Sequence, residues 1–336
     1  MNAPNLTRKD FQTDQDVRWC PGCGDYAILA ALQKVLPERG KRKEDLAVIS
    51  GIGCSSRLSY YVDSYGFHTI HGRALCFATG LKAANQELEV WVISGDGDSL
   101  SIGGNHLIHL LRRNVDVNFL LFDNRIYGLT KGQYSPTSEV GKRTKSTPFG
   151  SVDRPFNPLS LALGAGGTFI ARSVDVFTPH LKQTLTEANA HRGTSFVHIF
   201  QNCNIFNDGA FDSFREKENR SDNTLVLEHG KPLIFGKDRD RGIRLGDGMR
   251  AEIVKLGNGI EESDLLIHDE QGSIAYLALL AQLEAPEFPV PIGVFRRVER
   301  PVFDEDMRHQ ASEVLEKKGA GDLAQALAAG NTWTIE

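Results

Sequence analysis

The sequence has no long apolar stretch, few cysteines and no excess of positive charge. No run approaches the roughly 20 apolar residues that a membrane helix needs. Residues 1–15 are polar and contain no hydrophobic segment of the signal-peptide kind. The net charge of −5 gives no support for nucleic-acid binding. We therefore expect a cytoplasmic protein that binds neither membranes nor nucleic acid.

The five cysteines among 336 residues are too few, and odd in number, for a disulfide framework in so large a chain. Cys20 and Cys23 form a C-x-x-C loop, made rigid by proline and turned by glycine, that aims two thiolates at one centre. Cys54 and Cys203 each follow an apolar run of strand length, so we expect them at strand ends. Cys76 falls in a helical pattern and is predicted to be a buried apolar residue.

The C-x-x-C loop and the two strand-end cysteines could therefore converge on a four-thiolate metal site. Such a site suits either zinc or an iron–sulfur cluster, and the spacing does not separate the two. A redox-active dithiol at Cys20 and Cys23 is a third interpretation. It is weakened because no thioredoxin-type strand precedes the motif.

A second pattern pairs Gly95-Asp96-Gly97 with Asp123-Asn124, with 26 residues between Gly97 and Asn124. The intervening periodicity predicts a strand at 89–94, a helix at 100–113 and a strand at 116–122. Such a crossover brings both strand ends to one edge of the sheet, where Asp96 and Asn124 would meet. One carboxylate, one amide oxygen and a backbone carbonyl suit Mg²⁺, which takes its other ligands from phosphate and water. A second copy, Gly246-Asp247-Gly248, lacks a matching Asn and is predicted to be a turn.

The rest of the chain predicts a doubly wound, mostly parallel α/β sheet. Further strands are expected at 46–50, 168–172 and 195–200, and helices at 25–35, 74–85, 157–164 and 176–191. We predict an N-terminal arm (1–15), an α/β domain (16–204) and a less regular C-terminal extension (205–336) with a helix at 272–283 and a strand at 294–298. We expect this extension to pack on the site or on a partner subunit. The segment 128–151 is too long for a plain connector, so we expect a loop that wraps a ligand.

Several motifs together resemble a known family. They are WCPGCGDY, GIGCSSR, HGRALCFATGLKAAN, SGDGDSLSIGGNH and DNRIYGLTKGQYSPTS. Over about residues 15–210 they are similar to the β subunit of 2-oxoacid:ferredoxin oxidoreductases, and the Gly-Asp-Gly pair resembles the thiamine diphosphate signature, with Asp-Asn where many members have Asn-Asn. The resemblance implies a fold of the thiamine diphosphate-binding type, with Mg²⁺ and a 4Fe–4S cluster on Cys20, Cys23, Cys54 and Cys203.

The resemblance also implies roles for single residues. Asp96, Asn124 and the backbone carbonyl of Ile126 would hold Mg²⁺. The residues that would line the cofactor are Ile52, Gly53, Cys54, Ser55, His71, Gly97, Asp98, Gly128 and Leu129. His71 and Lys131 are the candidate catalytic residues, His71 against the cofactor and Lys131 towards a substrate carboxylate. A helix-capping histidine and a solvated lysine are the plainer alternatives.

The implied reaction converts 2-oxoglutarate, CoA and oxidised ferredoxin to succinyl-CoA, CO₂ and reduced ferredoxin, reversibly. The segments 127–133 and 135–137 are more similar to the 2-oxoglutarate and broad 2-oxoacid branch than to the pyruvate branch, and Lys131 could pair with the second carboxylate. The glutamate that activates thiamine would come from a partner α subunit, which would also bind most of the CoA, so the chain is expected to be half of an active site in a heterodimer or a dimer of heterodimers. The alternatives are a pyruvate or broad-specificity enzyme, a carboligase or decarboxylase with a structural zinc, and an electron-transfer subunit without thiamine.

Overall fold

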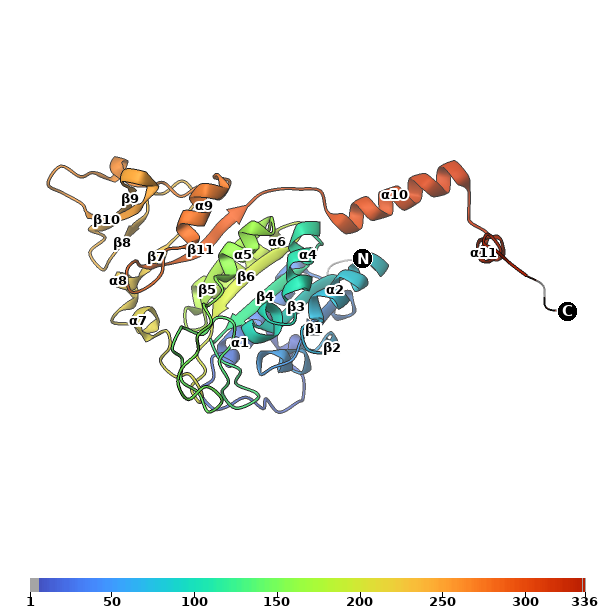
Figure 1. The fold of residues 1–336 in the computed structure, drawn as a ribbon, viewed down its shortest axis with the longest axis horizontal. Helices are drawn as coiled ribbons and strands as arrows, with labels where there is room; N and C mark the ends of the chain where they lie inside the picture. The colour runs from blue at the N-terminus through green and yellow to red at the C-terminus, as the bar shows by residue number, and fades with distance from the viewer. Residues whose placement is uncertain (1–5, 334, 336) are drawn as a thin grey trace.

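A mostly parallel sheet forms the centre of the protein, with helices on both faces (Figure 1). The structure is a computed structural model that describes residues 6–333 and 335. In spatial order the strands are β2 (Tyr65–His68), β1 (Leu46–Ser50), β3 (Glu89–Gly95), β4 (Asn118–Asp123), β6 (Ser195–Phe200), β5 (Phe169–Val174), β11 (Val290–Arg297) and β7 (Thr224–Val226). Among the described residues of this sheet, every neighbouring pair is parallel except β5–β11, which is antiparallel. The predicted α/β class is confirmed.

The strands are apolar on both sides, so two cores form, one on each face of the sheet. In β3, Val90 and Val92 belong to one core, and Trp91 and Ile93 belong to the other. The first core is covered by α2 (Ala74–Ala84), α4 (Gly104–Arg113), α5 (Pro158–Gly164) and α9 (Ile274–Ala281), and the second by α1 (Asp25–Val35) and α6 (Thr178–Ala190). This arrangement leaves the carboxyl ends of the central strands as the open edge of the sheet.

The helix predicted at 100–113 is confirmed from Gly104 onward as α4, but its predicted start is wrong, because Leu100 is the last residue of a separate helix, α3 (Asp96–Leu100). Ser101 has φ −89° and ψ −110°, which no helix tolerates. The chain then passes close to the end of α3: a Cβ at Gly103 would lie 2.5 Å from the carbonyl oxygen of Asp98. The break lets α3 begin at Asp96 itself, directly after β3.

The C-terminal third contributes more to the sheet than the sequence indicates. The predicted strand at 294–298 is the longer β11, and β11 and β7 complete the main sheet. A small antiparallel sheet of β8 (Ile234–Phe235), β9 (Arg241–Leu245) and β10 (Ala251–Lys255) lies beyond them (Figure 1). The turn predicted at 246–248 joins β9 to β10. The division of the chain after residue 204 stays a prediction.

The remaining elements are short or peripheral. They are α7 (Asp212–Arg215), α8 (Arg220–Asn223), α10 (Phe303–Lys318), α11 (Leu323–Leu327) and the 3-10 turns η1 (Arg8–Phe11), η2 (Leu36–Arg39), η3 (Lys43–Asp45), η4 (Ser55–Tyr60), η5 (Asp247–Met249) and η6 (Glu262–Asp264). Across residues 6–333 and 335, none of the helices combines the length and the apolar character that crossing a bilayer requires.

Candidate functional site

Four neighbouring strands end at one edge of the sheet, and a predicted site residue follows each of them. The strands are β1, β3, β4 and β6, in that spatial order. Cys54 follows β1, Asp96 follows β3, Asn124 follows β4 and Cys203 follows β6. Because these strands are parallel, their carboxyl ends bring the predicted magnesium and cluster residues to the same edge. We call this edge the carboxyl edge.

Asp96 is buried at the start of α3 and lies next to a second carboxylate, Asp123. The Oγ atom of Thr137 lies 2.6 Å from Asp96 Oδ2 and 2.8 Å from Asp123 Oδ1. The Thr137 hydroxyl has one hydrogen and can donate it to only one of the two carboxyl groups. The other carboxyl group must therefore carry a proton of its own and donate it to the Thr137 oxygen. Burial and the Asp123 charge raise the pKa of Asp96 to about 7, which makes Asp96 the carboxyl group that carries the proton.

Two buried carboxylates side by side are the environment that a divalent cation stabilises, since its charge offsets both. The residues therefore fit Mg²⁺ at Asp96. Asn124 is also held in place: its Oδ1 accepts a hydrogen bond from the Ile126 amide (3.1 Å), and its Nδ2 donates to Gln201 (2.8 Å). An amide oxygen has two lone pairs, so Asn124 Oδ1 keeps one for a metal.

Asp98 is a buried anchor for the loop that carries His71. Its Oδ1 accepts the Gly72 amide (2.7 Å) and contacts His71 Nδ1, and its Oδ2 accepts the Ser94 hydroxyl. The carboxylate is thus directed at the neighbouring loops, and it holds the His71 ring at the edge of the site. A side chain at Gly97 would collide with Tyr127, whose hydroxyl donates to the Gly97 carbonyl (2.8 Å). Glycine at 97 is needed for this close packing.

The turn after β1 exposes backbone to the site. Gly53 has φ +141°, and a Cβ there would meet no atom within 4 Å, so its surroundings are open. Ile52 and Cys54 flank it and are half-buried, whereas Ser55 is buried where η4 begins. The turn 52–55 could therefore admit a ligand against its backbone.

All four predicted cluster cysteines line one cavity of about 200 Å³, together with residues predicted to bind the thiamine cofactor and the substrate. Its lining includes Cys20, Cys23, Cys54, Cys203, Asn124, Gly128, Leu129 and Lys131. A Cβ at Gly128 would lie 3.6 Å from the sulfurs of both Cys54 and Cys203. The two sets of predicted residues therefore adjoin, with Gly128 between them.

The environment of these four cysteines favours a bound metal cation. Burial raises the pKa of the Cys23 thiol, and the Asp25 carboxylate raises it further. Burial, Asp25 and Cys203 together raise the pKa of the Cys54 thiol to about 12. Asp25 is itself buried, which raises its pKa to about 7, and its Oδ1 has no hydrogen-bond partner in the described residues. Metal binding deprotonates thiols and compensates such charges, so the donor set fits a thiolate-bound metal.

In the described part of the chain, no three His, Cys, Asp or Glu side chains are grouped closely enough to hold a metal ion. The four sulfurs share a cavity but do not form a finished coordination shell. Cys76 lies elsewhere, in α2, and its thiol donates to the Arg73 carbonyl (3.1 Å). It is half-buried, less than the sequence predicts.

Sequence reasoning missed several residues of the site. Thr137 lies in the long loop that was expected to wrap a ligand, but nothing in its spacing marks it as the bridge between two carboxylates. The sequence marks Asp123 only as the residue that stands where many members of the family have an asparagine. Asp25 could have been found, because it stands two residues after Cys23 in the C-x-x-C motif.

A known domain family matches the segment that carries the carboxyl edge. Residues 51–199 match the family described as thiamine pyrophosphate enzyme, C-terminal TPP binding domain. The match begins in the turn after β1 and ends within β6. It therefore contains Asp96, Asn124 and the loop between β4 and β5.

Other similarities are longer, and two of the three that follow cover 98% of the chain. It is 50% identical over 332 residues to the 2-oxoglutarate oxidoreductase subunit KorB of Mycobacterium tuberculosis, which covers 98% of this chain and 88% of that protein. It is 46% identical over 198 residues to subunit beta of 2-oxoacid:ferredoxin oxidoreductase 1 of Aeropyrum pernix, covering 59% of this chain and 62% of that one. A solved 2-oxoglutarate:ferredoxin oxidoreductase of Magnetococcus marinus, with 2-oxoglutarate, coenzyme A and succinyl-CoA bound, is similar with a TM-score of 0.76 at 32% identity, covering 98% of this chain and 97% of that one.

Proposed function

The chain belongs to the β subunits of 2-oxoacid:ferredoxin oxidoreductases, and on that basis we propose that, with an α subunit, it oxidises 2-oxoglutarate. CoA and oxidised ferredoxin are the co-substrates, and succinyl-CoA, CO₂ and reduced ferredoxin are the products. The observation that carries the proposal is the 50% identity to a 2-oxoglutarate oxidoreductase subunit over 98% of the chain. The unpaired cysteines fit a reducing compartment, so we place the enzyme in the cytoplasm.

We assign the cofactors to the carboxyl edge. Asp96, Asn124 and the carbonyl of Ile126 would hold Mg²⁺ and through it the diphosphate of thiamine. Cys20, Cys23, Cys54 and Cys203 would hold a 4Fe–4S cluster. When bound, thiamine diphosphate supplies a carbon nucleophile and an electron sink for decarboxylation, and the cluster supplies a one-electron acceptor. The shared cavity supports a short path between them.

This chain's own residues position the substrate and the cofactor. Lys131 lines the shared cavity from a turn in which its amide donates to the Gly128 carbonyl (3.0 Å), so its ammonium can pair with a substrate carboxylate. His71, fixed by Asp98, would hold a proton at its ring nitrogen beside the cofactor. Trp19 also lines the cavity, and its indole N–H donates a hydrogen bond to the Cys54 carbonyl (2.6 Å).

The test is an activity assay on the complex of this chain with its α subunit, purified without oxygen. We expect CoA-dependent reduction of ferredoxin with 2-oxoglutarate, at a kcat/KM at least about tenfold above that with pyruvate, which corresponds to about 1.4 kcal/mol. The chain alone should be inactive. Equal rates with several 2-oxoacids would favour the broad-specificity enzyme. Zinc in place of iron would favour the carboligase or decarboxylase.

A further inference from the structure

Three polar side chains interrupt one face of the central sheet. They are Asp123 of β4, His198 of β6 and Arg172 of β5, and none of them is more than 2% exposed. Arg172 is the register partner of His198, and the two follow Ile170 and Phe196 of the first core by two residues each. Residues two apart in a strand face the same side. Polar groups therefore replace the apolar core on this face, close to the carboxyl edge.

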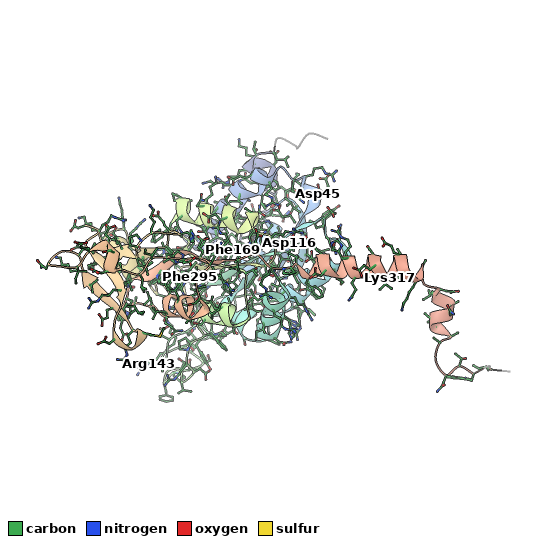
Figure 2. All side chains as sticks on the ribbon, turned by 90° about the horizontal axis from the view of Figure 1, so that it is seen from above. Asp45, Asp116, Arg143, Phe169, Phe295 and Lys317 are labelled. Atoms are coloured by element: carbon green, nitrogen blue, oxygen red, sulfur yellow. The ribbon has the colours of Figure 1, made fainter. Side chains whose placement is uncertain are left out.

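Arg172 carries a buried charge without a carboxylate partner. Its Nε donates to His198 Nδ1 (3.1 Å), and its Nη1 has no hydrogen-bond partner among the described residues. Its Cζ lies 5.1 Å from the centroid of the Phe200 ring and 5.6 Å from that of Phe295, which is marked in Figure 2. Burial lowers the pKa of Arg172 to about 10, which leaves the group charged at neutral pH. An unpaired charge in such a place costs several kcal/mol.

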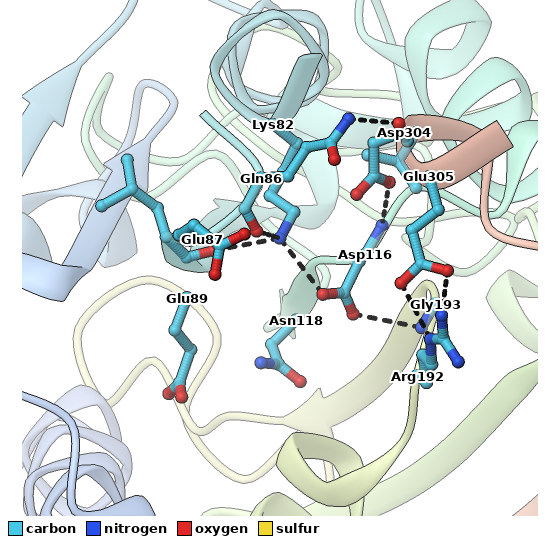
Figure 3. Close-up of polar contacts among 12 residues, drawn as sticks. Lys82, Gln86, Glu87, Glu89, Asp116, Asn118, Arg192, Gly193, Asp304 and Glu305 are labelled. Carbon is cyan, nitrogen blue, oxygen red and sulfur yellow. Dashed lines mark hydrogen bonds and ion pairs between the residues drawn. The ribbon is translucent and has the colours of Figure 1, made fainter. Parts of the chain in front are cut away.

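The buried cation Lys82 shows how the chain satisfies such a charge when it needs no ligand (Figure 3). Its Nζ donates to the Asp116 carboxylate (3.1 Å) and to the carbonyls of Gln86 (2.8 Å) and Leu88 (3.0 Å). Every donor of the ammonium group is thereby used. The guanidinium group of Arg172 has more donors than an ammonium group, yet its one hydrogen bond goes to an uncharged ring nitrogen. Arg172 therefore lacks the partners that Lys82 has.

Arg172 lines a cavity of about 330 Å³ together with a second arginine, Arg125. Arg125 is half-buried, and its Nε has no hydrogen-bond partner in the described part of the chain. Its Cζ lies 5.9 Å from the centroid of the same Phe200 ring. Two guanidinium groups beside one ring repel each other, and an anion between them would offset this repulsion.

The carboxylates that line this cavity do not supply that anion. Asp123 accepts the His198 Nε2–H (2.8 Å), and Glu139 pairs with Lys142 (3.1 Å). Glu284 is exposed to solvent. Within the described residues, none of these carboxylates forms an ion pair with the side chain of either arginine. A ligand from outside the chain is the remaining source of a negative partner.

We propose that this cavity binds a small organic acid whose carboxylate pairs with Arg172 and Arg125. The carbon atoms of the ligand lie against Phe156 and Phe200, which also line the cavity. A planar carboxylate matches the guanidinium fork, and the apolar rings favour an organic acid over inorganic phosphate. The cavity shares no lining residue with the cavity of the four cysteines, so this site is separate from the proposed substrate and cluster sites.

Calorimetric titration with benzoate tests the proposal on the complex of this chain with its α subunit, with thiamine diphosphate and Mg²⁺ present and at constant ionic strength. Benzoate has a carboxylate and a flat apolar body but no oxo group, so it cannot react as a substrate. We expect saturable binding at a single site on this chain. Benzamide, which has the same shape without the charge, and inorganic phosphate should bind at least about tenfold more weakly, which is about 1.4 kcal/mol. Binding of either at the strength of benzoate, or no binding of benzoate, would overturn the proposal.

Variants of the chain locate the bound benzoate. Arg172→Met and Arg125→Met should each weaken its binding at least about tenfold. Arg125 is half-buried, so its variant still gives an answer if Arg172→Met does not fold. Arg143→Met removes the same charge from an exposed position in the same loop as Arg125 (Figure 2), and it should leave binding unchanged. Binding that survives both cavity variants would refute the site.

Lys131→Met separates this site from the proposed substrate site. It should leave benzoate binding unchanged, because Lys131 lines the other cavity. Loss of binding in Lys131→Met but not in Arg172→Met or Arg125→Met would place benzoate at the substrate site and contradict the proposal. No turnover is measured, so the result does not depend on whether the complex oxidises 2-oxoglutarate.

Discussion

His198 donates its Nε2–H to the Asp123 carboxylate 2.8 Å away, and this bond decides which of two adjacent buried acids stays charged. Burial alone would raise the pKa of Asp123, but the hydrogen bond and the nearby positive charges outweigh it and lower that pKa. Burial lowers the pKa of His198 to about 4, so the ring is neutral and keeps one N–H to donate. Asp96 has hydrogen bonds to the Ser135 and Thr137 hydroxyls, but these do not outweigh its burial and the Asp123 charge, so Asp96 takes up the proton instead.

A pH dependence of stability follows. The pKa of Asp96 is about 7 in the folded chain and about 3.8 when exposed, so the folded state holds the extra proton between these values. The contribution of Asp96 to stability should therefore fall as pH rises from about 4 to about 7, by up to about 1.4 kcal/mol per pH unit. In urea unfolding without Mg²⁺, the slope of stability against pH should be more negative for the natural chain than for Asp96→Asn by this amount, because Asp25 and the buried histidines titrate in both proteins. Identical slopes in the two proteins would contradict the assignment.

Thr137→Val should destabilise the chain without Mg²⁺ by about 1–3 kcal/mol, because it removes the hydroxyl between two buried carboxyl groups while keeping the side-chain volume. Binding of Mg²⁺ and thiamine diphosphate should also weaken. Thr130→Val, in the same loop but exposed, is the control and should change neither quantity. Chemical unfolding and calorimetric titration measure both effects. Equal behaviour of the two variants would exclude a bridging role for Thr137.

Much of the central fold follows from the sequence for a physical reason. A strand buried on both faces is a continuous apolar run, and β1 and β6 begin and end where such runs predict. The carboxyl-edge placement of Asp96, Asn124 and Cys203 follows from the same runs. β7 and β2 were missed, because they are short and lie at the edges of the sheet, where few apolar residues mark a strand.

The hydrogen bonds around Asp96 could not be predicted from the pattern of apolar residues. Thr137 reaches the site from a loop without periodicity, and its contacts depend on how that loop folds over the carboxyl edge. The break at Ser101 was hidden because the apolar spacing continues through it. The pattern of apolar residues fixes where strands end, whereas the bonds between loops depend on tertiary packing.

Cys203→Ser should abolish the iron–sulfur cluster and leave binding of thiamine diphosphate partly intact. In the natural chain, the Cys203 and Cys54 sulfurs both lie next to Gly128, 3.6 Å from where a Cβ there would be. Serine is a poor ligand for iron in such a site. Iron and sulfide analysis of protein purified without oxygen gives the result. Cys76→Ser, in α2 and outside the cavity, should keep the full iron content. Retention of iron by Cys203→Ser would rule out the four-thiolate site.

Lys131→Met should raise the KM for 2-oxoglutarate at least about tenfold, since one charge-assisted contact to the second carboxylate is worth about 1.5–3 kcal/mol. The KM for pyruvate, which lacks that carboxylate, should change much less. Lys145→Met, exposed in the same loop region, should leave both values unchanged. A parallel loss with both substrates would assign Lys131 to the cofactor or to folding.

The most direct test concerns the shared carboxyl edge. Thiamine diphosphate, magnesium, iron and sulfide should be measured in protein purified without oxygen, for the natural chain and for Asp96→Ala. The natural chain should contain thiamine diphosphate, magnesium and a four-iron cluster, and Asp96→Ala should lose the first two while keeping the iron. Thiamine diphosphate bound equally by both proteins, or zinc in place of iron, would contradict the account.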